Sequence, residues 1–139
     1  MKANLLSNTP ALSKLLNKCR DFGERNGYLP TIDGRKIWLR SWEGKLLIHT
    51  ALNCLLQSNG SILCKRAIVI CNKELKKKGL DAKQVIFYHD ENVIDCEESI
   101  AEEVAEIAER SFREAGEYYK LRIRTDGESH IGKTWGDIH

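Results

Sequence analysis

Residues 84–96 read QVIFYHDENVIDC, which places two short runs of β-branched and aromatic residues on either side of a polar tetrapeptide. This pattern predicts a β-hairpin that carries His89, Asp90 and Glu91 at its tip. Because the flanking strands are apolar enough to be buried, neighbouring carboxylates at this tip would be poorly solvated and would repel each other. A bound cation relieves that cost, and carboxylate oxygens suit Mg²⁺. The alternative is a solvent-exposed tip in which the same residues only form the turn.

The hairpin is flanked by two segments with helical periodicity. Residues 45–75 are strongly apolar and predict a long core helix, which the turn-forming residues 58–60 should bend or split. After the hairpin, Ser99 and Glu102 predict a capping box at the start of an amphipathic helix that ends near residue 115. Residues 119–125 alternate between polar and apolar and predict a final strand.

The N-terminal part of the chain predicts one more helix and one more hairpin. Thr9-Pro10 is a good helix start, and the helix should run from about residue 10 to residue 25 before Gly27 ends it. Residues 28–39 predict a hairpin with a basic tip, where Arg35 and Lys36 follow the turn. The whole pattern predicts an α+β fold: a helical N-terminal half, an antiparallel sheet that includes the carboxylate-bearing hairpin, and a helix packed on that sheet.

Polar side chains interrupt the apolar core helix at a regular spacing. His49, Asn53 and Gln57 lie four residues apart and therefore form one stripe on a helix. Side chains that donate hydrogen bonds suit the DNA minor groove, where acceptors recur in every base pair. Arg35 and Lys36 could contact phosphates in the same way. The alternatives are a helix with one solvated face and ordinary surface cations.

The composition is that of a soluble globular chain about the size of one domain: 139 residues, 42% hydrophobic and 30% charged. We find no apolar run long enough to span a membrane and no signal peptide, so we expect a cytoplasmic protein without a membrane partner. Five cysteines without a Cys-x-x-Cys pair argue against a zinc ribbon or a disulfide framework. The net charge of +2 hides a basic half, residues 1–80, and an acidic half, residues 81–139.

Four segments, taken in order, resemble the C-terminal palm and fingers portion of family A DNA polymerases, the group of bacterial DNA polymerase I, and most of all its short phage-type members. These segments are residues 27–36 (GYLPTIDGRK), residues 50–58 (TALNCLLQS) running into residues 64–65 (CK), residues 88–91 (YHDE) and residues 135–139 (WGDIH). The resemblance extends from about residue 8 to the last residue. It implies that residues 1–139 form one partial domain.

The resemblance also implies roles for individual residues. Asp90 would be a catalytic metal ligand, Glu91 its supporting acid, and His89 would lie next to the primer terminus. Asn53 and Gln57 would contact the minor groove of the primer-template, whereas His49 replaces the arginine that the family usually has there. The reaction would be nucleotidyl transfer from a dNTP with two Mg²⁺ ions, of which this chain supplies only part of the site.

The sequence lacks the other metal-bridging aspartate of the family and its nucleotide-binding fingers helix. We therefore expect no polymerisation by this chain alone, because positioning catalysis needs the complete site. One interpretation is a split DNA polymerase for DNA replication, with Met1 as a genuine start and a complementary N-terminal fragment as partner. The second is an inactive truncated remnant, and the third is a small α+β nucleic-acid-binding module. We also expect that sheet edges left without their partner strands would drive self-association.

Overall fold

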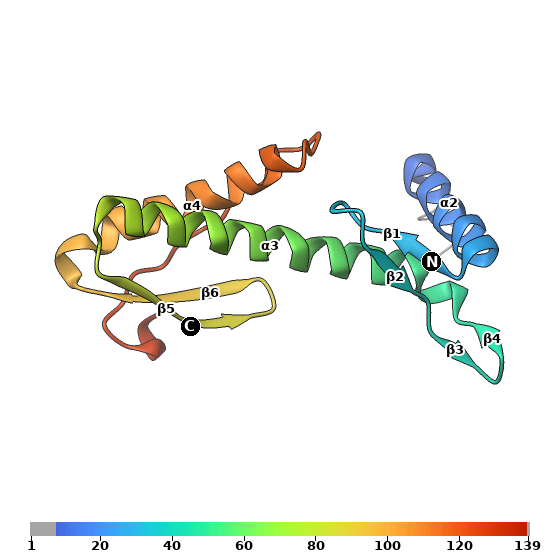
Figure 1. The fold of residues 1–139 in the computed structure, drawn as a ribbon, viewed down its shortest axis with the longest axis horizontal. Coiled ribbons are helices and arrows are strands. Elements are labelled where there is room, and N and C mark those ends of the chain that lie inside the picture. The colour runs from blue at the N-terminus through green and yellow to red at the C-terminus, as the bar shows by residue number, and fades with distance from the viewer. Residues whose placement is uncertain (1–7, 139) are drawn as a thin grey trace. The chain divides into compact units, whose positions relative to one another are not determined.

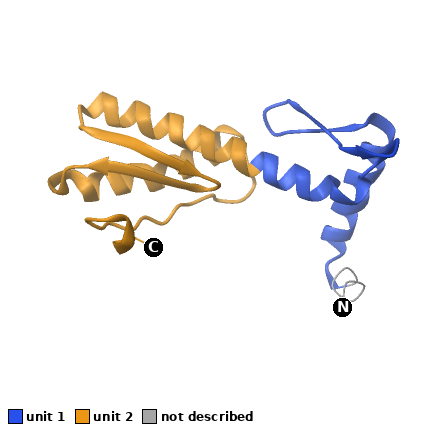
Figure 2. Cartoon of the chain, turned by 90° about the horizontal axis from the view of Figure 1, so that it is seen from below, with its two compact units in different colours: residues 1–59 blue, residues 60–139 orange. Residues whose placement is uncertain are grey.

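The computed structural model describes residues 8–138, so Met1 and His139 lie outside the described residues. The chain divides into two compact units, residues 1–59 and residues 60–139 (Figure 2). The boundary falls within one long helix, α3 (Ala51–Lys78). The two units are therefore described separately.

Unit 1 contains the predicted N-terminal helix and the predicted hairpin. Helix α2 (Pro10–Asn26) has Pro10 at its first position and ends at Gly27, which adopts a left-handed φ of 73°. Strand β1 (Tyr28–Pro30) pairs antiparallel with β2 (Lys36–Trp38). The core of the unit consists of four buried side chains surrounded by partly buried ones. The buried residues are Cys19, Leu29, Leu39 and Ala51, and Phe22, Ile48, Leu52 and Leu55 pack against them.

The predicted helix over residues 45–75 was wrong at its start and in its interruption. Residues 41–46 form a short ribbon of β3 (Ser41–Trp42) and β4 (Lys45–Leu46), because Glu43 and Gly44 both have positive φ and make a tight turn. A 3₁₀ turn, η1 (Ile48–Thr50), leads into α3, which continues through residues 58–60 without a break. Asn59 is held there because its side-chain oxygen accepts a hydrogen bond from the backbone of Ile32, at 3.0 Å.

Unit 2 contains the carboxylate-bearing hairpin and a helix packed against it. Strand β5 (Ala82–Tyr88) pairs antiparallel with β6 (Glu91–Cys96), with an irregularity in register at Val85. After η2 (Glu98–Ile100), helix α4 (Ala101–Tyr118) lies against the C-terminal half of α3 (Figure 1). The buried side chains where these helices meet are Cys71, Leu75, Val104 and Ile107, and Ile94 and Cys96 of β6 pack against them. The predicted α+β fold is confirmed.

Two details of the prediction for unit 2 were wrong. Helix α4 has no side-chain cap, because residues 98–100 form a 3₁₀ turn before it; a capping box forms instead between Thr134 and Asp137, at η3 (Trp135–Asp137). Residues 119–125 form no strand. Lys120 has a positive φ, and the Thr125 hydroxyl donates a hydrogen bond of 2.7 Å to the Phe112 carbonyl, so this segment is attached to α4. Among the described helices, none is both long and apolar enough to cross a membrane.

Candidate functional site

The tip of the β5–β6 hairpin is tighter than a four-residue loop. Tyr88 pairs with Glu91, so His89 and Asp90 alone form the turn and Glu91 begins β6. His89 has a φ of 53°, a left-handed conformation that histidine tolerates better than most residues. Its ring packs edge-on against the ring of Tyr88, with 4.3 Å between ring centroids. The hairpin thus places three consecutive polar side chains at the end of a two-stranded ribbon.

Asp90 is exposed at this tip and Glu91 is half-buried. The expectation of buried flanking strands was wrong for β5: Val85, Ile86 and Tyr88 are all exposed. Asp90 nevertheless lies close enough to α3 to act on a buried group there. Burial raises the pKa of the Cys64 thiol, and the negative charge of Asp90 raises it further. Among the residues that the structure describes, none forms an ion pair with Asp90, so its charge is available to a cation.

The donor chemistry at the tip fits part of a magnesium site. Two neighbouring carboxylates are hard oxygen donors, and Mg²⁺ commonly uses one or two carboxylates and takes its other ligands from water and phosphates. Within the described part of the chain, no group of three or more His, Cys, Asp or Glu side chains could hold a metal ion. Asp90 and Glu91 would therefore need further ligands from outside the described residues.

The polar stripe lies in unit 1. Asn53 and Gln57 are exposed in the first turns of α3, on the side away from core residues such as Ala51 and Leu55. His49 is also exposed, but it lies in the 3₁₀ turn η1 and not in the helix itself. The stripe therefore faces solvent. Both interpretations of it, a contact with the DNA minor groove and an ordinary solvated helix face, require this exposure.

The two predicted phosphate contacts differ in what surrounds them. Arg35 donates through Nε to Asp33 at 2.6 Å, and Lys36 places its Nζ 4.5 Å from the ring centroid of Tyr28. A hydrogen bond from the Thr31 hydroxyl, with further bonds from the backbone and guanidinium of Arg35, lowers the pKa of Asp33. Arg35 is therefore partly neutralised by its own turn.

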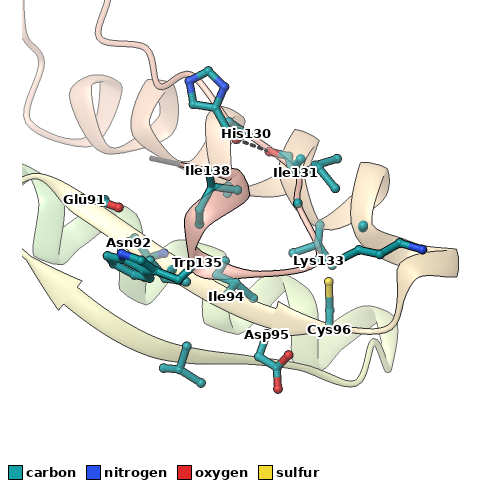
Figure 3. A pocket seen from close by; sticks show the side chains of 18 of the residues that line it. Glu91, Asn92, Ile94, Asp95, Cys96, His130, Ile131, Lys133, Trp135 and Ile138 are labelled. Carbon is teal, nitrogen blue, oxygen red and sulfur yellow. Dashed lines mark hydrogen bonds between the residues drawn. The ribbon is translucent and has the colours of Figure 1, made fainter.

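A groove of about 820 Å³ along β6 was not predicted. Consecutive residues from Glu91 to Cys96 line it, so it follows the edge of β6 that does not pair with β5, and residues 128–135 line the opposite side. Figure 3 shows Asn92 and Ile94 of β6 opposite Trp135 and Ile138 of the C-terminal segment. The side-chain oxygen of Asn92 is buried and has no hydrogen-bond partner among residues 8–138. The expectation of sheet edges without their partner strands pointed to such a surface, whereas residues 119–125, which were predicted to form a strand, do not line it.

Two exposed tryptophans in unit 1, Trp38 and Trp42, were also missed. The signal that could have found them is the stretch RKIWLRSWEGK, residues 35–45, in which basic residues alternate with aromatic ones.

Comparison with known proteins gives a consistent set of similarities. A family model described as DNA polymerase family A matches residues 1–137. The chain is 31% identical over 140 residues to the DNA-directed DNA polymerase of Escherichia phage Phieco32, a match that covers 100% of this chain and 23% of that protein. It is 31% identical over 160 residues to the DNA-directed DNA polymerase of Escherichia phage T7, covering 100% of this chain and 22% of that protein.

A bacterial relative and a solved structure extend the comparison. The chain is 34% identical over 122 residues to DNA polymerase I of Aquifex aeolicus (strain VF5), covering 88% of this chain and 20% of that protein. A structure described as the POL domain of Pol1 from M. smegmatis, in complex with DNA primer-template and dNTP, matches with a TM-score of 0.71 and 20% identity. That match covers 79% of this chain and 20% of the other, and it shows likeness of fold.

The chain spans less than a quarter of the length of each of these curated relatives. The family model, by contrast, covers nearly all of its residues. This chain therefore belongs to DNA polymerase family A.

Proposed function

We propose that this chain is the C-terminal part of a DNA-directed DNA polymerase domain and supplies part of its active site. Primer-template DNA and a dNTP would be the substrates. The observation that carries the proposal is the family match over residues 1–137, combined with the exposed carboxylate of Asp90 at the two-residue turn between β5 and β6. The relatives that match over the whole chain are themselves DNA-directed DNA polymerases.

Asp90 and Glu91 would hold Mg²⁺, and His89 would lie beside the primer end. When bound, Mg²⁺ supplies activation of the primer 3′-hydroxyl and neutralises charge that develops on the phosphates. Asp90 contributes a fixed negative charge, because the two-residue turn and the β5–β6 pairing hold its backbone in place. Glu91, at the first position of β6, would support that charge from the partly buried side.

Asn53 and Gln57 would donate hydrogen bonds to the minor groove, and Arg35 and Lys36 would contact phosphates. Amide donors on one exposed face of α3 suit acceptors that recur in every base pair, so these contacts would not select a sequence. His49 would extend the same stripe by one turn. Gln57→Ala should weaken primer-template binding by the complete enzyme more than by this chain alone, because its contact forms only when the duplex end is seated.

The complementary fragment would insert a strand into the groove along β6. Among the described strands, β6 pairs with β5 alone, and a buried acceptor such as the Asn92 side-chain oxygen is costly until a donor reaches it. A strand between β6 and residues 128–135 would supply N–H donors to both sides. It would also bring the second metal-bridging aspartate that this chain lacks.

Reconstitution tests the proposed function. This chain, mixed with a complementary fragment that carries the other metal-bridging aspartate and the fingers helix, should restore Mg²⁺-dependent primer extension that neither part shows alone. Asp90→Asn should lower kcat by several orders of magnitude and leave association of the fragments intact, since it removes charge without changing size. Glu91→Gln should cost less, and His89→Ala should mainly disturb placement of the primer end.

Asp81→Asn is the matched control. Asp81 is an exposed carboxylate just before β5, paired with Lys83 at 3.2 Å, so its loss should leave extension unchanged. Equal extension by wild type and Asp90→Asn would show that the metal site is wrongly assigned. A wild-type pair that associates but never extends a primer would favour the inactive remnant. A small nucleic-acid-binding module would bind DNA in this assay and likewise never support extension.

A further inference from the structure

The most exposed aromatic side chains of unit 1 are two tryptophans on neighbouring ribbons. Trp38 is 68% exposed on β2 and Trp42 is 70% exposed on β3. Burial of a tryptophan side chain contributes more free energy than burial of almost any other side chain. A single exposed apolar residue is ordinary, but two large exposed rings beside clustered cations mark a binding surface. We call Trp38, Trp42, Lys36 and Lys45 the aromatic–basic surface.

The strand register directs the first ring away from the core. Tyr28 pairs with Trp38 and Pro30 pairs with Lys36, so Tyr28, Trp38 and Lys36 share one face of the β1–β2 ribbon. The opposite face carries Leu29, which is buried in the core of the unit. The Trp38 ring meets the Tyr28 ring edge-on with 5.4 Å between centroids, and Phe22 holds Tyr28 from behind at 5.7 Å. Trp38 is therefore supported from the protein side and open to solvent.

Each tryptophan has a cation on its own ribbon. Lys36 Nζ lies 6.0 Å from the centroid of the Trp38 ring, within range of a cation–π interaction. On the second ribbon Trp42 pairs directly with Lys45 across the tight turn, and Arg40 precedes Trp42 by two residues. Four cations and two carboxylates occur in residues 27–47, and one of the carboxylates, Asp33, is already paired with Arg35. The surface is thus aromatic and positively charged.

The separation of the two rings suits a short oligonucleotide. Trp38 and Trp42 are four residues apart, so their Cα atoms lie at most about 14 Å from each other along an extended chain. Site sizes of roughly four nucleotides or more are usual for surfaces that bind single strands by stacking. Two rings within this distance can therefore contact bases of one short strand.

We propose that the aromatic–basic surface binds single-stranded DNA, with unpaired bases stacked on Trp38 and Trp42 and the backbone held by Lys36 and Lys45. This deepens the proposed function and rests on it for the identity of the nucleic acid. Stacking needs a free base face, which duplex DNA does not offer away from its ends. A protein partner fits less well, because lysine is depleted at the centre of protein interfaces.

Titration of the full chain with a short unstructured oligodeoxynucleotide tests the proposal by tryptophan fluorescence. Trp135→Ala removes the third tryptophan, 50% exposed in unit 2, and leaves only the two proposed ring platforms as reporters. In that background the single strand should quench fluorescence and should bind more tightly than a blunt duplex of equal length. Trp38→Ala and Trp42→Ala should each weaken binding by about fivefold or more, and Trp38→Phe should restore part of it.

Charge and control variants complete the experiment. Lys36→Gln should weaken binding of the single strand. It should also reduce the slope of log affinity against log salt concentration by about the amount that one phosphate contact contributes. Trp135→Ala alone should leave affinity unchanged, as judged by electrophoretic mobility. Equal affinity for single strand and duplex, or tryptophan variants that bind like wild type, would overturn the proposal. Loss of self-association in Trp38→Ala, without loss of DNA binding, would instead assign the surface to a protein contact and also overturn it.

The outcome is separable from that of the proposed function. Asp90→Asn should leave the dependence of quenching on Trp38 and Trp42 unchanged, since Asp90 supplies neither a ring nor a cation to the aromatic–basic surface. If the reconstituted wild-type pair extends a primer but the tryptophan variants bind single-stranded DNA like wild type, only the proposed stacking surface is rejected. If quenching by the single strand depends on both tryptophans but the reconstituted pair never extends a primer, only the proposed polymerase function is rejected.

Discussion

At the scale of single residues, the buried thiols give the chain a distinct response to alkaline pH. Burial raises the pKa of Cys71 above its ordinary value, and a hydrogen bond with Ser111 only partly offsets this. A thiol whose folded pKa is raised stabilises the fold fully below its unfolded pKa of about 9, and the contribution is lost as pH rises through the folded pKa. We therefore expect the free energy of unfolding to fall above about pH 9.

Cys71→Ala isolates this effect from other groups that titrate in the same range. The variant should be less stable at pH 7, because Cys71 is 2% exposed in the core of unit 2, but its stability should decline less steeply between pH 8 and pH 10. Urea unfolding under reducing conditions at several pH values measures the difference. Parallel curves for wild type and variant would contradict the assignment.

The sequence indicated which polar residues lie at the hairpin tip, but it did not indicate how exposed the flanking strands are. His89, Asp90 and Glu91 were predicted at a hairpin tip because strand-forming residues flank them, and the structure has a turn at that place. Burial of the strands was predicted from their apolar residues, but β5 is largely exposed, because among the described strands it pairs with β6 alone. Trp38 and Trp42 were missed for a related reason: an aromatic residue in a strand pattern usually faces a core.

At the scale of elements, local propensity predicted the wrong secondary structure in two situations. In one, the cost of an unfavourable residue was small enough for the helix to continue; in the other, a predicted strand had no partner strand among the described residues. Ser58, Asn59 and Gly60 favour a turn, yet α3 continues, because a glycine inside a helix costs only about 1 kcal/mol relative to alanine. Residues 119–125 have the alternation of a strand but pair with none among the described residues. Residues 45–46 were predicted as the start of the helix but form β4, because a strand of two residues carries no alternation of its own.

Gly60 provides a direct test of the continuous helix. Apart from the adjoining residues and the backbone of α3 itself, no atom of the described residues lies within 4 Å of the position a Cβ would take at residue 60, so Gly60→Ala should raise the free energy of unfolding by about 0.5–1 kcal/mol. Gly23→Ala is the matched control in α2. There the added Cβ would come within 2.6 Å of a Leu39 methyl group in the core, so this variant should destabilise. A destabilised Gly60→Ala would mean that the helix breaks at this position in solution.

At the scale of the whole molecule, the two cores are small for a chain of this length. Among the described residues, each core centres on a cluster of four buried side chains with partly buried neighbours, and unit 2 leaves several large apolar residues in solvent. Those exposed residues include Val85 of β5 and Ile131 beside the groove along β6. A stable monomer rarely leaves an apolar groove beside an unpaired strand edge, so we infer that a second polypeptide strand normally occupies this face.

In the absence of a partner fragment, the groove should therefore drive self-association. Sedimentation velocity should show oligomers whose fraction rises with concentration, and the complementary polymerase fragment should suppress them by taking the same site. Val85→Lys and Ile131→Lys place charges at exposed positions of the groove, so each should shift the chain toward monomer without unfolding it, as circular dichroism would show. Ile123→Lys, at a residue 74% exposed but outside the groove, should associate like wild type. A chain that sediments as a monomer at every concentration would mean that β6 needs no partner strand, and the proposed insertion of a strand would then lose its physical basis.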